Sequence, residues 1–456
     1  MELEGSKVLV VGFGKTGEAV VRFLLRRKAR VKVSEKKRRE ELEEKINFWQ
    51  EKGVRFETGG HSLQTFLKSD LIVISPGVPP SPLLRAAYEK GIPVISEIEL
   101  AYRFLRGRIV GITGTNGKST TTTLTHKILK DNGYQAFLAG NIGNPLINFV
   151  EKSRDEHFFV TEISSFQLQY TENLKVDISV FLNISDDHLD WHSSFRDYLE
   201  AKKKLVLRQA KGTKAVLNRD HPLVWKLSQQ TEAVVYPFSR KREVERGCFL
   251  RQGKIILADG GEQELMAAAE IPLFGIHNLE NVMASSLVAH ILNVNPSRIR
   301  KSVKEAEGLE HRLEKVATIN GIDFFNDSKA TNVEATLKSL ESFDKKIILI
   351  LGGRDKGSDF TRLRTPVTRK VKKVLLIGEA GEKIRKALDG AAEFLETSSL
   401  KEAVGLSYKE AKPGEVVLLA PACTSFDMFQ NFEQRGKVFK KEVFDLKNRL
   451  DKGKFK

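Results

Sequence analysis

A chain of 456 residues is two to three times the length of a typical domain, so we expect two or three compact units rather than a small disulfide-stapled scaffold. Apolar residues make up 41% and charged residues 29%, a balance typical of folded globular proteins that excludes wholesale disorder. The formal net charge of +16 suits an anionic partner, either nucleic acid, a membrane surface or a phosphorylated small molecule.

The sequence carries no mark of export, disulfide scaffolding or membrane insertion. Its two cysteines, Cys248 and Cys423, lie far apart and outside any C-x-x-C pattern, which excludes a disulfide framework and a cysteine-rich zinc site. The segment after Met1 lacks the basic region and cleavage site of a signal peptide. The longest apolar runs, 346–351 and 416–422, are far shorter than the roughly 20 residues that span a bilayer. We therefore expect a reducing, cytoplasmic location.

Short β-branched runs recur along the chain, and each is followed by a turn and a helical stretch. The predicted strands are 8–11, 71–74, 109–112, 158–160, 178–181, 347–351 and 416–419. This alternation is typical of parallel sheets joined by crossover helices, so the predicted fold class is α/β. In such sheets ligands bind where strands end and helices begin, so function is expected in the loops that follow strands.

A glycine-rich loop follows a predicted strand at three places. These loops are 12–17, 111–119 and 352–356, and each belongs to a separate stretch of alternating strands and helices. We therefore predict three domains, 1–97, 98–308 and 309–456. The charged run 440–456 is expected to be helical with a frayed basic end.

The loop after the predicted strand 109–112 is a variant of the phosphate-binding P-loop. Its glycines let backbone N–H groups surround phosphate oxygens, and the start of the following helix adds its positive end. Lys118 is placed to bridge the β and γ phosphates, and Ser119 or Thr120 offers a hydroxyl to Mg²⁺. The ATP-binding residues predicted here are Gly114, Thr115, Asn116, Gly117, Lys118, Ser119 and Thr120.

Four segments resemble the Mur ligase family, the ATP-dependent amide-forming enzymes of peptidoglycan precursor synthesis. They are T-G-T-N-G-K-S-T from Thr113, E-I-S-S-F-Q-L from Glu162, G-I-H-N-L-E-N from Gly275 and N-D-S-K-A-T-N from Asn326. The resemblance runs through the whole chain, and the second segment is similar to that of the branch that adds D-glutamate. It implies three domains, the first and last Rossmann-like and the central one P-loop ATPase-like.

The resemblance implies two Mg²⁺ ions in the central domain. Their implied ligands are Ser119, Glu162, His188 and a carbamylated lysine, whose carbamate replaces a cation with an anion able to face the metal. The register of the sequence selects Lys202 for this modification, and Lys203 is the alternative. His188 with its neighbouring aspartates also fits a zinc site, but the resemblance assigns it to magnesium.

The resemblance places further ATP contacts in the later segments. Asn278 and Asn281 are three apart on one helical face and are implied to hold adenine edges or the acyl end of the substrate, the alternative being a helix cap. Arg312 and Asp327 are implied to close over ATP, with Asp327 at the ribose, and Lys329 to face the reacting phosphoryl group. The expected catalytic residues are Lys118, His188, Lys202 and Lys329.

Contacts to D-glutamate are implied in the third domain. The implied residues are Thr331, Lys356, Ser425 and Phe432. A cation and hydroxyls suit the two carboxylates of this amino acid, and Phe432 is expected to contribute its backbone or its ring.

The first glycine loop has two interpretations. G-x-G-x-x-G after an initial strand, with Glu35 ending the next strand, is by itself typical of dinucleotide binding. The resemblance instead implies that this domain holds the UDP of a sugar nucleotide, with its pyrophosphate at the start of the following helix. The residues implied to contact this substrate are Gly14, Lys15, Thr16, Ser34, Glu35, Lys36, Ser75, Gly77, Asn141 and His188.

The resemblance implies a ligase that joins D-glutamate to UDP-N-acetylmuramoyl-L-alanine through an acyl phosphate, with release of ADP and phosphate, in support of cell wall synthesis, cell shape and cell division. One alternative is an amide ligase of the same family with another substrate. Another is a nucleotide-gated nucleic-acid-binding protein, but the basic runs lack interleaved aromatic residues. The excess charge attracts polyanionic substrates or belongs to a heat-adapted surface. We expect a monomer with small-molecule partners only.

Overall fold

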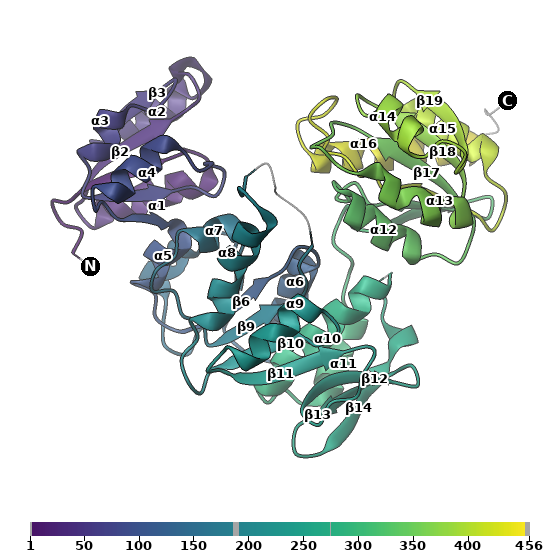
Figure 1. The fold of residues 1–456 in the computed structure, drawn as a ribbon, viewed down its shortest axis with the longest axis horizontal. Helices are drawn as coiled ribbons and strands as arrows, with labels where there is room; N and C mark the ends of the chain where they lie inside the picture. The colour runs from purple at the N-terminus through teal and green to yellow at the C-terminus, as the bar shows by residue number, and fades with distance from the viewer. Residues whose placement is uncertain (1, 186–190, 274, 452–456) are drawn as a thin grey trace. The chain divides into compact units, whose positions relative to one another are not determined.

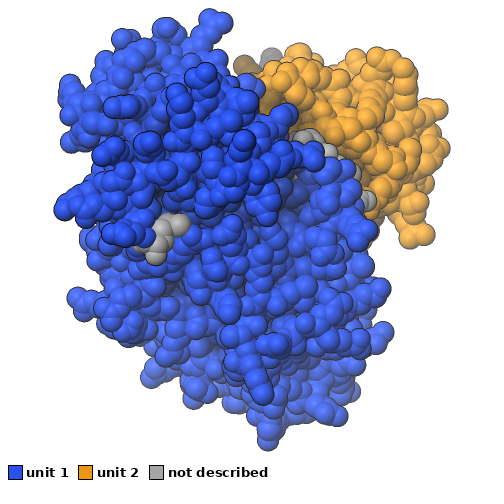
Figure 2. Space-filling model, turned by 60° about the vertical axis from the view of Figure 1, so that its left-hand side comes forward, with its two compact units in different colours: residues 1–267, 281–303 blue, residues 268–280, 304–456 orange. Residues whose placement is uncertain are grey.

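The computed structural model describes residues 2–185, 191–273 and 275–451. The chain divides into two compact units, one formed by residues 1–267 and 281–303 and the other by residues 268–280 and 304–456 (Figure 2). Two sheets belong to the first unit and one to the second (Figure 1). Within the described ranges, no helix has an apolar stretch of the length that a bilayer crossing requires.

The first sheet is parallel throughout, in the order β3-β2-β1-β4-β5. Its strands are β1 (Lys7–Val11), β2 (Arg30–Glu35), β3 (Arg55–Thr58), β4 (Leu71–Ile74) and β5 (Val94–Ser96). Its helices are α1 (Lys15–Arg26), α2 (Glu43–Gln50), α3 (Leu63–Leu67), α4 (Pro82–Glu89) and α5 (Glu97–Tyr102). In β1, Val8 and Val10 join one buried cluster while Leu9 and Val11 join another, so both faces of the sheet are covered.

The second sheet has the order β14-β13-β12-β11-β10-β9-β6-β8-β7. Its strands are β6 (Arg108–Thr113), β7 (Ala136–Gly140), β8 (Phe158–Glu162), β9 (Ile178–Phe181), β10 (Lys214–Asn218), β11 (Val234–Ser239), β12 (Gly247–Arg251), β13 (Lys254–Ala258) and β14 (Glu262–Ala267). The associated helices are α6 (Lys118–Asp131), α7 (Ser165–Gln169), α8 (Phe195–Leu207), α9 (Pro222–Trp225), α10 (Ile276–Ile291) and α11 (Pro296–Lys304). All neighbouring pairs from β12 to β7 in this order are parallel. The pairs β12–β13 and β13–β14 are antiparallel and form one edge of the sheet.

The third sheet has the order β15-β16-β20-β17-β18-β19. Its strands are β15 (Glu314–Ile319), β16 (Ile322–Asn326), β17 (Ile347–Gly352), β18 (Val371–Ile377), β19 (Glu393–Thr397) and β20 (Val416–Leu419). Its helices are α12 (Val333–Glu341), α13 (Arg364–Lys370), α14 (Gly381–Ala387), α15 (Leu400–Glu410) and α16 (Phe432–Asp451). All pairs are parallel except the β15–β16 hairpin.

The structure confirms the α/β class and places every predicted strand in a β-strand. The antiparallel hairpins β12–β13 and β15–β16 were not predicted. Each is marked in the sequence only by a two-residue turn, Gln252-Gly253 or Asn320-Gly321, in which both residues have a positive φ. The sheets lie within 7–96, 108–267 and 314–419, and the domain limits 1–97, 98–308 and 309–456 stay a prediction.

Candidate active site

The P-loop joins the central strand β6 to helix α6. Gly117 caps the helix with a φ of +84°, and a Cβ built on it would lie 2.3 Å from the Oδ1 of Asn281. The Nζ of Lys118 donates hydrogen bonds to the carbonyls of Gly114 at 3.0 Å and Thr115 at 2.7 Å. The lysine is thereby held over its own loop, beside the amides that begin the helix, which is an arrangement suited to polyphosphate.

Two residues that received no role from the sequence hold this loop in shape. Asn183, two residues beyond β9, accepts from the N–H of Asn116 at 2.9 Å and donates back to its carbonyl at 3.1 Å. The Tyr198 hydroxyl, from α8, shares a 3.0 Å hydrogen bond with the hydroxyl of Thr115. Their only sequence signal is their position relative to β9, the strand that pairs with β6: Asn183 follows β9, and Tyr198 lies on the next helix, α8.

Glu162 ends β8, the strand beside β6, and its side chain is buried. Its Oε1 accepts from the Nδ2 of Asn141 at 2.7 Å, and its backbone carbonyl accepts from the N–H of Asn141 at 2.9 Å. Its other oxygen, Oε2, has no hydrogen-bond partner among the described residues. A buried carboxylate oxygen without a partner is costly, and a hard cation such as Mg²⁺ would satisfy it. The carboxylate therefore fits the predicted role of metal ligand.

Lys202 and Lys203, the two candidates for modification, lie in different surroundings. Lys202 is 1% exposed, and its Nζ donates to the carbonyl of Gly114 at 2.8 Å and lies 4.9 Å from the centroid of the Tyr198 ring. Lys203 forms an ion pair with Glu200 at 2.7 Å. The geometry favours Lys202, which lies against the P-loop.

His188 and its neighbouring aspartates lie outside the described residues. Among the residues that the structure does describe, no three His, Cys, Asp or Glu side chains gather where they could hold a metal ion. His192 is buried, stacks on Phe166 with centroids 5.7 Å apart, and shares a hydrogen bond with Ser165. It belongs to the packing of this region.

The conformation of the first glycine loop, residues 12–17, is held by close packing and hydrogen bonds within the first sheet region. A Cβ on Gly17 would lie 2.0 Å from the carbonyl oxygen of Gly12, so only glycine allows helix α1 to approach the loop this closely. The Ser75 hydroxyl donates to the same carbonyl at 3.0 Å. The Oε2 of Glu35 accepts from the N–H of Phe13 at 2.6 Å, so this carboxylate shapes the loop.

The other residues predicted for the sugar nucleotide differ in exposure. Ser34 lies within β2 and is fully buried, and its hydroxyl contacts His61 at 2.7 Å and Glu57 at 3.3 Å. Lys15 donates to the carbonyl of Gly143 at 2.6 Å, which links this loop to the loop after β7. Of the predicted positions that the structure describes, the exposed ones are Gly14, Lys15, Lys36, Gly77 and Asn141, and the half-buried ones are Thr16 and Glu35.

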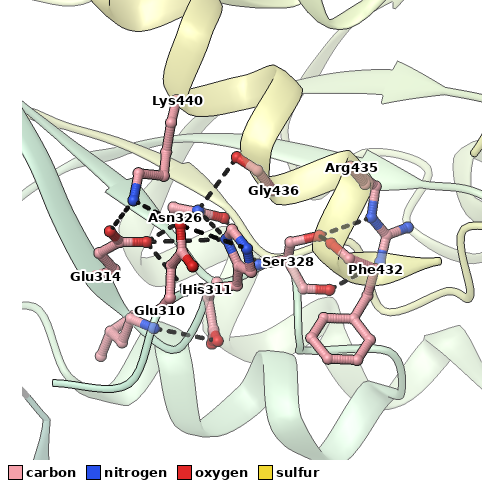
Figure 3. Close-up of polar contacts among 11 residues, drawn as sticks. Glu310, His311, Glu314, Asn326, Ser328, Phe432, Arg435, Gly436 and Lys440 are labelled. Carbon is pink, nitrogen blue, oxygen red and sulfur yellow. Dashed lines mark hydrogen bonds and ion pairs between the residues drawn. The ribbon is translucent and has the colours of Figure 1, made fainter.

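In the second unit, a buried arginine joins the segments predicted to bind D-glutamate (Figure 3). Arg435, 2% exposed, donates to the carbonyls of Ser328, Cys423 and Thr424 at 2.8, 3.1 and 3.2 Å, and to the Ser328 hydroxyl at 3.0 Å. Burial lowers the pKa of this guanidinium to about 10. No role was predicted for Arg435, because its partners are three backbone carbonyls and a hydroxyl that no motif reveals.

In this part of the second unit Lys329 and Phe432 lie in contact, and Arg435 binds the backbone next to Ser425. The Ser328 hydroxyl donates to the carbonyl of Phe432 at 2.8 Å, and the Nζ of Lys329 lies 3.7 Å from the centroid of the Phe432 ring. Ser425 is buried and directly follows Thr424. Thr424 pairs with Arg354 through reciprocal backbone hydrogen bonds of 3.0 Å, two residues before the exposed Lys356. Thr331 is half-buried in the same segment as Lys329.

The residues predicted to close over ATP differ in their exposure to solvent. Asp327 is buried, accepting from the N–H of Leu313 at 3.2 Å and from the Ser339 hydroxyl, and burial raises the pKa of its carboxyl. Arg312 is half-buried. Helix α10 crosses the division between the two units, with Asn278 in one and Asn281 in the other. Asn281 accepts a hydrogen bond from the Thr121 hydroxyl at 3.2 Å.

Ion pairs and packing around His311 hold helix α16 against the start of β15 (Figure 3). Lys440 pairs with Glu310 at 3.0 Å and with Glu314 at 2.5 Å. The buried ring of His311 contacts Asn326 at 2.9 Å, and a Cβ on Gly436 would lie 2.2 Å from the same ring. Burial lowers the pKa of His311, which favours its neutral form in this packing.

Comparisons with known proteins match all three sheets to one family. Residues 6–96 match the "Mur ligase MurD-like, N-terminal domain", residues 112–289 the "Mur ligase middle domain", and residues 311–423 the "Mur ligase, glutamate ligase domain". The UDP-N-acetylmuramoylalanine–D-glutamate ligase of Acidobacterium capsulatum is 46% identical, with 96% of each chain covered. The protein of the same name from Koribacter versatilis is also 46% identical, with 97% of this chain and 98% of the relative covered.

Solved structures show the same fold at low sequence identity. A pseudomurein peptide ligase type C from Methanothermus fervidus has a TM-score of 0.62 at 18% identity, with 97% of this chain and 100% of that chain covered. MurF ligase from Thermotoga maritima, in complex with ADP, has a TM-score of 0.61 at 17% identity, with 98% and 96% covered.

Replacing Gly117 by alanine tests the P-loop geometry. The new Cβ would overlap Asn281, so the loop must open, and we expect the affinity for ATP to fall by at least about tenfold. Gly212→Ala is the matched control, since its φ of +90° imposes similar backbone strain with no atom within 4 Å. Calorimetric titration with ATP separates the two effects, and equal losses in both variants would contradict the steric explanation.

Proposed function

This chain belongs to the Mur ligase family, and we propose that it joins D-glutamate to UDP-N-acetylmuramoyl-L-alanine with consumption of ATP. The observation that carries the proposal is the central-sheet site, where the P-loop with Lys118 follows β6 and the half-satisfied carboxylate of Glu162 ends the neighbouring strand β8. The choice of D-glutamate is supported by relatives of that name that are 41–46% identical over nearly the whole chain.

In the proposed reaction a carboxylate oxygen of UDP-N-acetylmuramoyl-L-alanine attacks the γ-phosphorus of ATP, and ADP leaves. The amine of D-glutamate then attacks the carbonyl carbon of the acyl phosphate, loses a proton, and expels inorganic phosphate as the amide forms. Every reactant is an anion, so catalysis is mainly neutralisation and alignment. Lys118 and Lys329 are proposed to face the phosphoryl group, and exclusion of water would protect the acyl phosphate.

Magnesium fits this site on the chemistry of its donors. Glu162 offers the free Oε2, Ser119 a hydroxyl at the start of α6, and His188 and a carbamate on Lys202 complete the proposed ligand set. Bound Mg²⁺ would supply positive charge between the phosphate oxygens and the attacking carboxylate. Asn141 holds the other oxygen of Glu162 and so sets the orientation of the carboxylate.

The remaining contacts are proposed by region. The loop of Gly14 to Gly17, with Lys36, Ser75 and Gly77, would hold the UDP group, and Asn141 the acyl end of that substrate. Asn278, Asn281, Arg312 and Asp327 are proposed for ATP. Thr331, Lys356, Ser425 and Phe432 are proposed for D-glutamate. We also propose that the protein acts as a monomer in the cytoplasm on small-molecule substrates.

One assay tests the proposed function as a whole. Phosphate release from ATP is measured with UDP-N-acetylmuramoyl-L-alanine and each of D-glutamate, L-glutamate, L-lysine and diaminopimelate. We expect turnover with D-glutamate alone. Preferential turnover with another amino acid would assign the protein to a different ligase reaction.

Lys202→Ala tests the carbamate. We expect it to be nearly inactive while folded, and acetate or formate to restore part of the rate by supplying the missing anion to the site. Lys203→Ala is the matched control, because Lys203 pairs with Glu200 and is expected to keep its activity. Steady-state rates measured with and without acetate at about 0.1 M show which lysine is modified. A loss of activity in Lys203→Ala with none in Lys202→Ala would assign the carbamate to Lys203.

Lys356→Ala tests the amino-acid pocket. A charge-assisted contact to a carboxylate contributes about 1.5–3 kcal/mol, so KM for D-glutamate should rise by roughly 10- to 150-fold, with KM for ATP nearly unchanged. Lys386→Ala removes another surface cation, 75% exposed, from the same unit and controls for the change in overall charge. A rise in KM for the UDP substrate instead of D-glutamate would show that the pocket has been assigned wrongly.

A further inference from the structure

Helix α5, which follows the last strand of the first sheet, carries two buried carboxylates that bind backbone amides of the central-sheet region. Glu99 accepts from the N–H groups of Glu172 and Leu174, both at 3.0 Å, and pairs with Arg103 at 2.9 Å. Glu97, 1% exposed, accepts from the N–H of Ile147 at 2.7 Å through its Oε1. The Oε2 of Glu97 has no hydrogen-bond partner among the described residues.

Glu97 binds the end of residues 140–147, which run from the last residue of β7 through the following loop to the start of a short 3-10 helix, η2 (Leu146–Lys152). We name this segment the Asn141 loop. At its start, Asn141 binds Glu162 through both its side chain and its N–H, as described above. In its middle, the carbonyl of Gly143 accepts from Lys15 at 2.6 Å. At its end, Leu146 and Ile147 are buried, and the N–H of Ile147 is bound by Glu97. The loop is therefore fixed at its start, middle and end.

Keeping a carboxylate at this position is costly for the folded protein. Burial raises the pKa of Glu97 to about 7, and the amides of Ile147 and Leu146 oppose that rise only in part. The deprotonated form keeps one oxygen unsatisfied in an apolar environment. An apolar side chain would avoid this cost, so the buried acceptor oxygen that holds Ile147 points to a role beyond packing, because functional positions are where proteins accept such losses.

We propose that Glu97 is a positioning residue for the ligase reaction, which fixes the Asn141 loop so that Asn141 orients the Glu162 carboxylate at the phosphate site. The proposal rests on the proposed function for the identity of that site. The order of contacts is Glu97 to Ile147, along the loop to Asn141, and from Asn141 to Glu162. Glu97 itself contacts neither substrate nor metal in this scheme.

A double-mutant cycle with Asn141 tests this chain of contacts. Glu97→Ala, Asn141→Ala and the double variant are assayed at pH 8, where wild-type Glu97 is mostly ionised, for kcat/KM with the UDP substrate. We expect Glu97→Ala to lower kcat/KM by about tenfold alone and by less than about twofold when Asn141 is already alanine. An equal loss in both backgrounds, or no loss at all, would overturn the proposal.

Two controls separate positioning from a general loss of structure. Glu99→Ala removes the other buried carboxylate of α5, which holds residues 172–174 instead, so its effect is expected to be the same factor in both backgrounds. Glu97→Gln keeps an acceptor oxygen for Ile147 and is expected to recover most of the rate. Glu97→Leu, which removes the acceptor and fills the same buried space, replaces Glu97→Ala in the cycle if the alanine variant does not fold.

Amide hydrogen exchange tests the structural step without turnover. Exchange in residues 140–147 should speed up by at least about tenfold in the folded Glu97→Ala variant and stay unchanged in Glu99→Ala. Unaltered exchange in Glu97→Ala would overturn the proposal. Absence of D-glutamate-dependent turnover in the wild-type protein would instead overturn the proposed function, and the exchange result would still stand.

Discussion

Parallel strand order in the central sheet is the constraint on which the candidate site depends. Strands β9, β6, β8 and β7 lie side by side and run in one direction, so their carboxyl ends meet at a single edge. The P-loop follows β6, Glu162 ends β8, the Asn141 loop follows β7, and Asn183 follows β9. Four segments that are far apart in sequence thus contribute to one small region. A change of strand order would disperse all of them.

Burial then determines what these groups can do. Glu162, Lys202 and Glu97 are each at most 2% exposed, and a charged group so placed interacts strongly with any ligand of opposite charge. In the second unit, Arg435 has the same character, since its hydrogen-bond acceptors are three carbonyls and a hydroxyl. Such groups are expensive in a folded protein. The proposed metal and anionic substrates account for Glu162 and Lys202, whereas Glu97 and Arg435 hold backbone groups in place.

The sequence predicted the fold class and the core strands because continuous apolar runs such as 347–351 can only be buried on both faces of a sheet. It also predicted the P-loop, whose glycines and lysine follow from phosphate chemistry. The side-chain contacts between distant segments could not be predicted from the sequence. Arg435 acts on backbone carbonyls, Tyr198 reaches Thr115 from another helix, and Ser34 turns to Glu57 and His61 because alternate residues of β2 face opposite sides. None of these pairings has a local signature.

In the proposed reaction a substrate carboxylate attacks ATP, and the activated acyl group then passes to the amine. Labelling the terminal carboxylate of UDP-N-acetylmuramoyl-L-alanine with ¹⁸O tests it most directly, by mass analysis of the phosphate released during turnover with D-glutamate. We expect the phosphate to carry one labelled oxygen for each amide formed, because that oxygen would bridge the acyl group and the phosphorus in the acyl phosphate. Unlabelled phosphate would mean that water attacks ATP, and it would contradict the mechanism.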